Sequence, residues 1–369
     1  MVLETEDIDI FGYERVIRVT DPDTNLKAII ALHNTTLGPG LGGTRMYPYE
    51  TFDDALEDVL RLSKGMTYKS GIVLSGTGGG KSVIIGDPKR DKTPELLASF
   101  AEAVNALEGR YICAEDVGIV PEDILTMLRT TKYVAGVPCF PGSGNPALYT
   151  GMGVFQAMRS ACAALDGDPS LKGKRVVIQG VGYVGSRLVD LLFWEGADLM
   201  IADIDEERLR RYAHAYRARI VPVDRVHTIP CDIFSPCALG GVINEESVPE
   251  LRCRAVVGSA NNQLSKPSDA DALRERGILY APDFVANAGG LLNVVNELGA
   301  GGYRATRARD MTMAIYDQLS AIYAEAERRA ISTDKVAVDI VDKRLLSGEG
   351  KRTEPLAFPF EELSAVLVR

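Results

Sequence analysis

The stretch GKRVVIQGVGYVGSRLVDLLFWEGADLMIADID, residues 173–205, decides the fold of this sequence. Its apolar run at 176–178 predicts a buried strand, and the pattern Gly180-x-Gly182-x-x-Gly185 follows directly. An amphipathic helix comes next, and a second strand, LMIAD, ends in Asp203, twenty-three residues after Gly180. A lone glycine pattern also fits an ordinary strand–helix turn. Here strand, turn, helix and terminal acid are all present, which predicts a dinucleotide-binding βαβ unit.

Each residue of this fingerprint has a physical role. Gly180 permits the tight turn, Gly182 lets the backbone approach a pyrophosphate, and Gly185 lets the helix pack on the sheet with its N-terminal amides facing the phosphates. Asp203 can accept hydrogen bonds from a ribose and would repel a 2′-phosphate, and Ile204 follows it where an arginine would favour NADP, so we expect NAD. The predicted cofactor-binding residues are Gly180, Gly182, Tyr183, Val184, Gly185 and Asp203.

Size and composition exclude several classes of protein. A chain of 369 residues suits two domains, and a net charge of −10 gives no electrostatic reason to bind nucleic acid or an anionic membrane. The six cysteines are scattered without a CxxC pair, which favours reduced thiols in the cytosol. With three histidines in all, a histidine-based metal site is not expected. The acidic N-terminus and the absence of a long apolar run predict a cytoplasmic protein without a membrane span.

The sequence predicts an α/β protein of two domains. From 173 to about 300 strands alternate with helices, which favours a parallel sheet with crossover helices. We therefore assign 141–329 to an NAD-binding Rossmann domain and 1–140 to a substrate-binding and oligomerisation domain, completed by a C-terminal segment of about 330–369. The substrate is expected in a cleft between the two domains.

The first half of the chain carries clear local signals. Residues 13–33 read as a hairpin, and the glycine-dense stretch 35–49 reads as a loop. A helix is expected from Thr51, with Lys69 near its C-terminal end. A second helix has Thr93 as its N-cap, Pro94 in its first turn and a stop at Gly109.

Later signals are sparser. A strand is expected at 110–116, and Pro121 is expected to open a short helix. The Gly- and Pro-rich segment 136–150 should cross between domains, and a long helical pattern covers about 306–330. The charged tail from Gly348 has no predicted place.

The stretch LSGTGGGKSVIIGDP, residues 74–88, raises the question of a nucleotide triphosphate loop. That loop needs a glycine five residues before Gly80, where this chain has Ser75, and its lysine should open a helix. Here Lys81 leads into a β-branched run, which predicts a strand. An exposed lysine beside an idle loop is the plain alternative, but three consecutive glycines favour a backbone that passes close to a ligand.

Two further residues could join Lys81. Lys69 lies twelve residues upstream, and if both lysines point into one cleft, repulsion and desolvation would lower a lysine pKa toward neutrality, where it could act as a base. Asp116, at the end of a strand, is a candidate to pass protons. Taken alone, Asp116 reads better as a turn acid and Lys69 as a solvated helix end, so the hypothesis depends on the combination.

The combination resembles the Glu/Leu/Phe/Val dehydrogenase family, over about residues 10–345. The matching motifs are LGPGLGGTRMYPYE, RLSKGMTYKSG, GGGKSVIIGDP, RYICAEDVG, SGNP, the stretch 173–205, CDIFSPCALGGVIN, VVGSANNQL and YAPDFVANAGGLLNVVNE. The wording of the motifs leans toward leucine dehydrogenases, with features like those of phenylalanine dehydrogenases. The resemblance implies reversible oxidative deamination of a hydrophobic L-amino acid by NAD, giving a 2-oxo acid and ammonium, in a homo-oligomer.

The resemblance also assigns roles to residues. It implies that Lys81 is the catalytic lysine that activates water, and that Asp116 exchanges protons with the amino group. Lys69, with the Gly42–Gly43 backbone, would bind the α-carboxylate. The remaining implied residues line the nicotinamide and the substrate, namely Asn261 and Asn287, or shape the side-chain pocket, namely Ala114, of the leucine/valine type, and Leu291, of the phenylalanine type.

Three segments depart from the family pattern: 72–77, 139–152 and the tail 348–369. They leave open a dehydrogenase for aromatic or non-standard amino acids. A non-catalytic NAD-binding regulatory protein is the alternative from another class.

Overall fold

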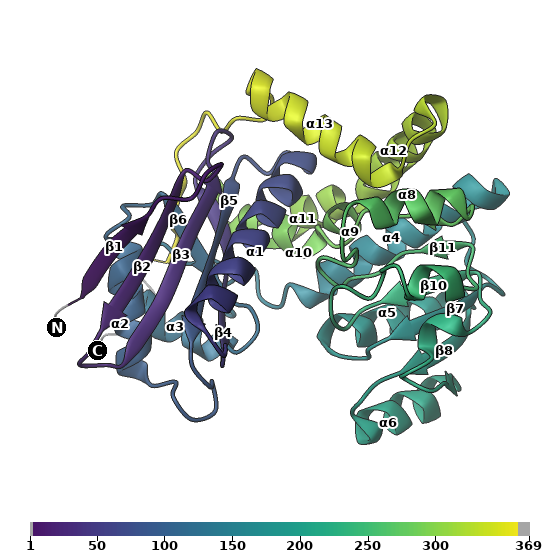
Figure 1. Ribbon diagram of the computed structural model, residues 1–369, viewed down its shortest axis with the longest axis horizontal. Coiled ribbons are helices and arrows are strands. Elements are labelled where there is room, and N and C mark those ends of the chain that lie inside the picture. Colours follow the sequence, from purple (N-terminus) through teal and green to yellow (C-terminus); the bar gives the residue numbers. More distant parts are fainter. Residues whose placement is uncertain (1–2, 361–369) are drawn as a thin grey trace. The chain divides into compact units, whose positions relative to one another are not determined.

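The computed structural model describes residues 3–360, and the chain divides into two compact units (Figure 1). Unit 1 comprises Met1–Asn145, Asn293–Ala305 and Val341–Arg369, and unit 2 comprises Pro146–Leu292 and Thr306–Ile340. The chain leaves unit 1 inside the predicted crossing segment 136–150. The return of 293–305 to unit 1 had no signal in the sequence. The functional names given to the two domains remain predictions.

Unit 1 is built on a six-stranded mixed sheet. In chain order its strands are β1 (Glu4–Ile8), β2 (Arg15–Asp21), β3 (Leu26–Asn34), β4 (Gly40–Tyr47), β5 (Gly78–Ile85) and β6 (Tyr111–Ala114). Their spatial order is β1-β2-β3-β5-β4-β6, antiparallel from β1 to β5 and parallel from β5 to β6. One face carries α1 (Phe52–Ile72), and the other carries α2 (Pro94–Asn105) and α3 (Pro121–Leu128) (Figure 1).

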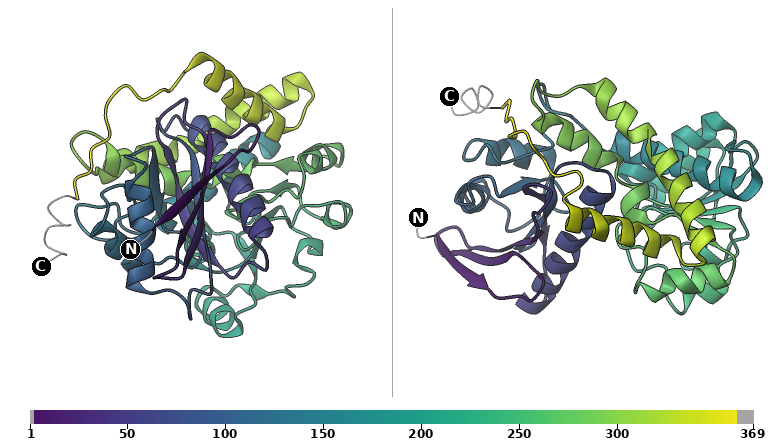
Figure 2. Two further views of the ribbon diagram at one scale, coloured as in Figure 1. Left: turned by 60° about the vertical axis from the view of Figure 1, so that its left-hand side comes forward. Right: turned by 90° about the horizontal axis from the view of Figure 1, so that it is seen from above.

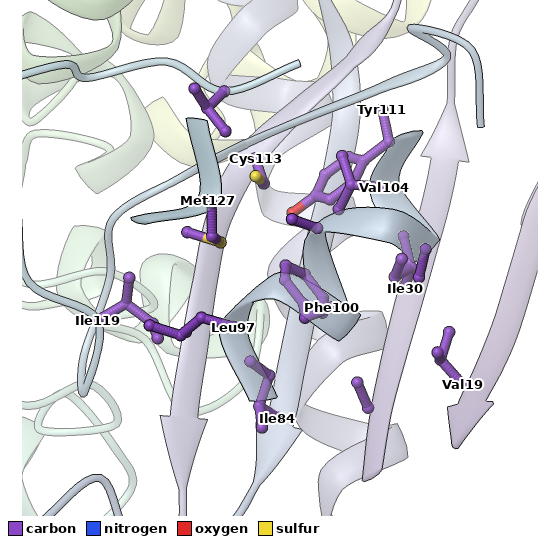
Figure 3. Close-up of a cluster of buried hydrophobic side chains, with 14 of the residues drawn as sticks. Val19, Ile30, Ile84, Leu97, Phe100, Val104, Tyr111, Cys113, Ile119 and Met127 are labelled. Atoms are coloured by element: carbon purple, nitrogen blue, oxygen red, sulfur yellow. The ribbon is translucent and has the colours of Figure 1, made fainter. Parts of the chain in front are cut away.

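The period-two alternation of the strands builds two cores. On β2, Ile17 and Val19 join the larger cluster beneath α2 and α3, whereas Val16 joins the smaller cluster beneath α1. Phe100 and Tyr111 are fully buried in the larger cluster. Figure 3 shows ten labelled members of it: Val19, Ile30, Ile84, Leu97, Phe100, Val104, Tyr111, Cys113, Ile119 and Met127.

Unit 2 is a doubly wound parallel sheet. Its strands are β7 (Arg175–Gln179), β8 (Asp198–Ala202), β9 (Arg219–Ile220), β10 (Ile233–Pro236), β11 (Ala255–Val256) and β12 (Leu279–Tyr280). The spatial order β12-β11-β10-β7-β8-β9 reverses direction between β7 and β10, which is the Rossmann arrangement. The predicted fold class is therefore confirmed.

The remaining helices connect these strands or follow them. They are α4 (Ala147–Asp166), α5 (Tyr183–Glu195), α6 (Glu206–Tyr216), η1 (Val226–Thr228), α7 (Ser247–Glu250), α8 (Ser268–Glu275), α9 (Asp283–Ala286), α10 (Gly289–Val295), η2 (Asn296–Leu298), α11 (Ala305–Met313), α12 (Ile315–Arg329) and α13 (Thr333–Ser347). Within the described residues no helix is long and apolar enough to cross a membrane.

Most local predictions for unit 1 are confirmed. Residues 13–33 form a hairpin, Thr51 caps α1 in a capping box with Asp54, and the Thr93 hydroxyl accepts from the Leu96 N–H. Two predictions are wrong. The stretch 35–49 contains β4, and α2 ends at Asn105, four residues before the predicted stop. Gly109 has φ +83° and lies in the turn between α2 and β6, so it does not end the helix.

The segments that departed from the family pattern have structural partners. The carboxylate of Glu297, fully buried, accepts hydrogen bonds from the N–H groups of Gly136 and Ser143, which holds the segment 136–145 against 293–305. Ser75 and Thr77 bond to each other, and the Arg352 side chain donates to the Gly76 carbonyl at 2.9 Å. The segment 72–77 and the part of 139–152 up to Asn145 therefore have structural roles within unit 1.

The tail returns over unit 1 after α13, as Figure 2 shows in yellow. Arg344 donates to the Ile72 carbonyl at the end of α1, 2.7 Å away. Phe358 packs edge-on against Tyr133, and Phe360 is fully buried in the larger core cluster. The remainder of the tail, 361–369, lies outside the described residues.

Candidate active site

Lys81 lies on β5, inside the sheet of unit 1. Its β-branched surroundings, Ser82-Val83-Ile84-Ile85, form a strand between β3 and β4, as predicted, so the triphosphate-loop alternative is excluded by local structure. The lysine is only 7% exposed. Its ammonium donates a short hydrogen bond to Oδ2 of Asp116, which follows β6. The structure thus brings the two predicted catalytic residues into direct contact.

Two glycines of β4 allow this contact. A Cβ on Gly43 would lie 2.5 Å from the Glu115 carbonyl oxygen and 2.8 Å from the Asp116 Cβ. A Cβ on Gly42 would lie 1.9 Å from the Gly80 carbonyl oxygen. Since real contacts are never so short, only glycine lets the segment after β6 approach β4 this closely. Gly43 therefore lets Asp116 lie against β4, and Gly42 lets β4 lie close to Gly80 of β5.

The glycine run before Lys81 packs closely against its neighbours in unit 1. A Cβ on Gly79 would lie 2.0 Å from the Thr67 Oγ1 of α1, and one on Gly80 would lie 2.8 Å from the Tyr111 ring. A Cβ on Gly78 would lie 2.4 Å from the Asn34 carbonyl oxygen. The backbone of these three glycines therefore passes close to other parts of the protein, and its predicted approach to a ligand stays a prediction.

Electrostatics keep Asp116 ionised. Burial raises the pKa of this carboxyl, but the Lys81 ammonium and the Arg45 guanidinium outweigh burial and lower it to about 2. The sequence analysis does not identify Arg45, because the glycine-dense stretch 35–49 predicts a loop where the structure has β4. Had β4 been recognised, the alternation of a strand would have placed Gly43 and Arg45 on one face.

Two other predicted residues of unit 1 lie on β6 and on α1. Ala114 is the last residue of β6, is buried, and lies opposite Gly43 in the parallel ladder. Lys69 lies in the last turn of α1 and is half-buried. Thr67 of α1 packs on Gly79 of β5. Lys69 follows Thr67 by two residues in the sequence, and Lys81 follows Gly79 by two residues. The predicted repulsion between the two lysines remains a prediction.

In unit 2, the glycine fingerprint forms the predicted turn. Gly180 has φ +98°, and a Cβ on Gly185 would lie 2.0 Å from the Gly180 carbonyl oxygen, so both glycines are required by the backbone. A Cβ on Gly182 would meet nothing within 4 Å. α5 begins next, and no side chain caps its N-terminus. Open space before an uncapped helix N-terminus fits a pyrophosphate.

Asp203 is tied to the same turn. Its Oδ2 accepts from the Val181 N–H at 2.7 Å and its Oδ1 accepts from the Asp205 N–H at 2.8 Å. Each carboxylate oxygen can accept a second hydrogen bond, so the acid holds the turn and can still receive a ribose hydroxyl. Tyr183, in the first turn of α5, and Ile204 are both exposed beside it, and Val184 is half-buried.

The two predicted asparagines also lie together. The Asn287 amide donates to the Asn261 side-chain oxygen at 3.0 Å and to the Ser259 carbonyl at 3.1 Å. Within the described residues, the buried Oδ1 of Asn287 has no hydrogen-bond partner. An unpartnered buried acceptor fits an amide ligand such as a nicotinamide carboxamide. Leu291, on α10, is buried in unit 2.

The Rossmann sheet with its open glycine turn and the buried Lys–Asp pair define the class, an α/β oxidoreductase. The chain belongs to the Glu/Leu/Phe/Val dehydrogenase family and is an amino-acid dehydrogenase. Residues 13–133 match the model of the Glu/Leu/Phe/Val dehydrogenase dimerisation domain. Residues 142–205 and 197–336 match the glutamate/leucine/phenylalanine/valine dehydrogenase model.

Individual relatives agree with this assignment. The chain is 49% identical over 343 residues to a phenylalanine dehydrogenase of Thermoactinomyces intermedius, covering 92% of this chain and 93% of the relative. It is 44% identical to a leucine dehydrogenase of Geobacillus stearothermophilus, covering 92% of each. The crystal structure of an L-tryptophan dehydrogenase from Nostoc punctiforme is 37% identical, with a TM-score of 0.77 over 92% of this chain and 97% of that chain.

Proposed function

We propose that the protein catalyses the reversible, NAD-dependent oxidative deamination of a hydrophobic L-amino acid to its 2-oxo acid and ammonium. The observation that carries this proposal is the contact between Lys81 and Asp116, buried beside the Gly42–Gly43 backbone in a member of an amino-acid dehydrogenase family. L-amino acid, NAD⁺ and water give 2-oxo acid, ammonium, NADH and a proton. When bound, the nicotinamide ring supplies the chemistry of hydride acceptance from Cα.

The residues of unit 1 would bind the amino acid and move its protons. Lys69 and the Gly42–Gly43 backbone would hold the α-carboxylate. Asp116, whose pKa the Lys81 ammonium and the Arg45 guanidinium lower, would accept a proton from the substrate ammonium group and pass it on at once. It is a relay and not a store of protons.

Lys81 would activate the water that attacks the imine carbon. An ammonium cannot act as a base, so Lys81 would have to lose its Nζ proton to solvent before it acts, while the Asp116 carboxylate in contact with it stays ionised. The neutral amine then takes a proton from water as the water attacks. This requirement predicts that deamination is faster at alkaline pH.

The residues of unit 2 would bind the dinucleotide. Gly180, Gly182 and Gly185, with the amides of Tyr183 and Val184, would receive the pyrophosphate, and Asp203 would receive the ribose. A carboxylate at this position disfavours a 2′-phosphate, which supports NAD over NADP. Asn287, with its unpartnered Oδ1, and Asn261 would orient the carboxamide.

The substrate side chain is apolar in this proposal. The aliphatic preference predicted from Ala114 stands as the first candidate. Aromatic amino acids are the second, supported by Leu291 and by the higher identity to a phenylalanine dehydrogenase, 49% against 44% for a leucine dehydrogenase. A single methylene in such a pocket is worth only about 1–3 kcal/mol, so one site can accept both groups.

Absorbance of NADH at alkaline pH across a panel of L-amino acids tests the proposal. Leu, Val, Ile, Phe and Trp are compared with non-standard analogues, with NAD and NADP in parallel, and 2-oxo acid and ammonium are quantified. We expect one NADH per ammonium with at least one hydrophobic amino acid. Folded protein that binds NADH but turns over none of them would contradict the proposal and favour a regulatory role.

We also propose that the protein forms a homo-oligomer, because residues 13–133 match a family model described as a dimerisation domain. Light scattering of the purified protein would measure its mass against the 39.9 kDa of one chain. A cytoplasmic location stays a prediction from the sequence.

A further inference from the structure

Arg45, on β4, lies between two carboxylates of unit 1. Its Nη1 donates to Oδ2 of Asp58 on α1 at 2.8 Å, and its Nε lies 3.5 Å from Oδ2 of Asp116. The side chain is 21% exposed, and within the described residues Nε has no hydrogen-bond partner. The hydroxyl of Tyr49 donates to the same Asp58 oxygen at 2.6 Å. A chain of contacts therefore runs from Tyr49 through Asp58 and Arg45 to Asp116.

Strand geometry explains this arrangement. In the parallel pair of β4 and β5, Thr44 lies opposite Ser82, so Lys81 is level with Gly43. Gly43 faces Asp116, and Arg45, two residues further on, is on the same face of β4. Lys81 and Arg45 thus approach Oδ2 of Asp116 from two adjacent strands.

The two cations differ in chemistry. Lys81 must lose its proton during the proposed reaction, and at that moment it no longer compensates the charge of Asp116. A guanidinium keeps its proton at every working pH, so Arg45 continues to do so. Without Arg45, a carboxylate whose side chain is only 18% exposed would lose the second of the two cations that contact it among the described residues.

The groups behind Arg45 are suited to hold it. Burial raises the pKa of the Tyr49 hydroxyl, and the nearby Asp58 carboxylate raises it further, so Tyr49 remains a donor. Asp58 then accepts from both Tyr49 and Arg45. The charged and titratable groups that interact with Asp116 are Lys81 of β5, Arg45 of β4, the neighbouring Glu115 and the Tyr111 hydroxyl of β6.

We propose that Arg45 is a positioning residue for Asp116: it keeps this carboxylate in place and ionised while Lys81 gives up its proton, and Asp58 and Tyr49 fix its guanidinium. The proposal rests on the proposed function for the roles of Lys81 and Asp116, but the ionisation of Asp116 can be measured without turnover.

The test compares Arg45→Gln with Arg45→Lys, Tyr49→Phe and the control Arg18→Gln. Arg18 also lies in unit 1, on β2, and its loss removes the same charge without a contact to Asp116. In protein labelled with ¹³C at aspartate carboxyls, the Asp116 resonance is assigned by its loss in Asp116→Asn. Its midpoint should rise by about 1–3 pH units in Arg45→Gln, less in Arg45→Lys, and not at all in Arg18→Gln.

Kinetics give the second readout. With the best amino acid of the panel, kcat of Arg45→Gln should fall at least tenfold, and its kcat/KM should decline more steeply toward acid pH than that of the wild type. Arg45→Lys should recover part of both, and Tyr49→Phe should show a smaller change in the same direction. An unchanged Asp116 midpoint, or an equal loss at every pH without recovery by lysine, would overturn the proposal. Absence of any turnover in the wild type would refute the proposed function, and the ionisation of Asp116 could still be measured from its ¹³C resonance.

Discussion

Asp334, in the first turn of α13 within unit 2, should make the free energy of unfolding fall as pH rises from about 4 to about 7. Burial raises the pKa of its carboxyl, and the carboxylates of Asp283 and Asp271 raise it further, to about 7 from an ordinary value of 3.8. Asp283 is itself buried and accepts from the Gln263 N–H at 2.6 Å. The substitution that tests this is Asp334→Asn, which keeps the shape of the side chain and removes the negative charge of its carboxylate.

The magnitude follows from the shift. A rise of about 3 pKa units at about 1.4 kcal/mol per unit corresponds to about 4 kcal/mol. Because the folded pKa is the higher one, the folded state retains a proton that the unfolded state has lost between about pH 4 and pH 7. The free energy of unfolding of the wild type therefore declines between about pH 4 and pH 7, and above pH 7 it declines no further on account of Asp334. Asp334→Asn lacks this decline.

Urea unfolding followed by circular dichroism at pH 5, 6, 7 and 8 measures the difference. Asp334→Asn should gain on the wild type by about 1.4 kcal/mol per pH unit up to pH 7 and by little beyond it. Asp310→Asn, at an exposed acid of the same unit, is the control and should give no slope. A difference between Asp334→Asn and wild type that stays constant from pH 5 to pH 8 would refute the reasoning.

Three further predictions concern packing and the nucleotide turn. Gly182→Ala should keep its thermal stability and lose at least tenfold in NADH affinity, measured by fluorescence titration. Gly185→Ala should be destabilised, because its Cβ would lie 2.0 Å from the Gly180 carbonyl oxygen. Equal thermal stability of the two variants would contradict the open turn at Gly182. Phe360→Ala should cost about 3–5 kcal/mol in urea unfolding, since this side chain is fully buried in the core of unit 1, and a loss below about 1 kcal/mol would show that the tail does not hold that core. Asp203→Asn should lower the ratio of NAD to NADP activity at least tenfold, and an unchanged ratio would mean that Asp203 serves the turn alone.

The nucleotide turn was predictable because its constraints are local. Gly180 and Gly185 are dictated by the backbone of a single turn, so their spacing in the sequence reports the structure directly. The caps at Thr51 and Thr93 are local for the same reason, since each bonds to a residue three positions away. The pair Lys81 and Asp116 needed the family resemblance, because nothing in the spacing of 35 residues brings them together.

What the sequence did not reveal depends on distant contacts. β4 was taken for a loop because its glycines resemble a turn, although they are required by the close approach of Gly80 and Glu115. Arg45 went unnoticed for that reason. The partners of the segment 72–77 include Arg352, 276 residues from Gly76, and no local pattern reports a contact of that range.

The most direct test of the central claim is kcat of Lys81→Ala with the best amino acid of the panel, beside the control Lys89→Ala. Lys89 is an exposed lysine of the same unit, so its removal should leave kcat unchanged. If Lys81 activates water beside Asp116, Lys81→Ala should lose about 10²–10⁴-fold in kcat while remaining folded and binding NADH. A kcat within threefold of the wild type would contradict the account.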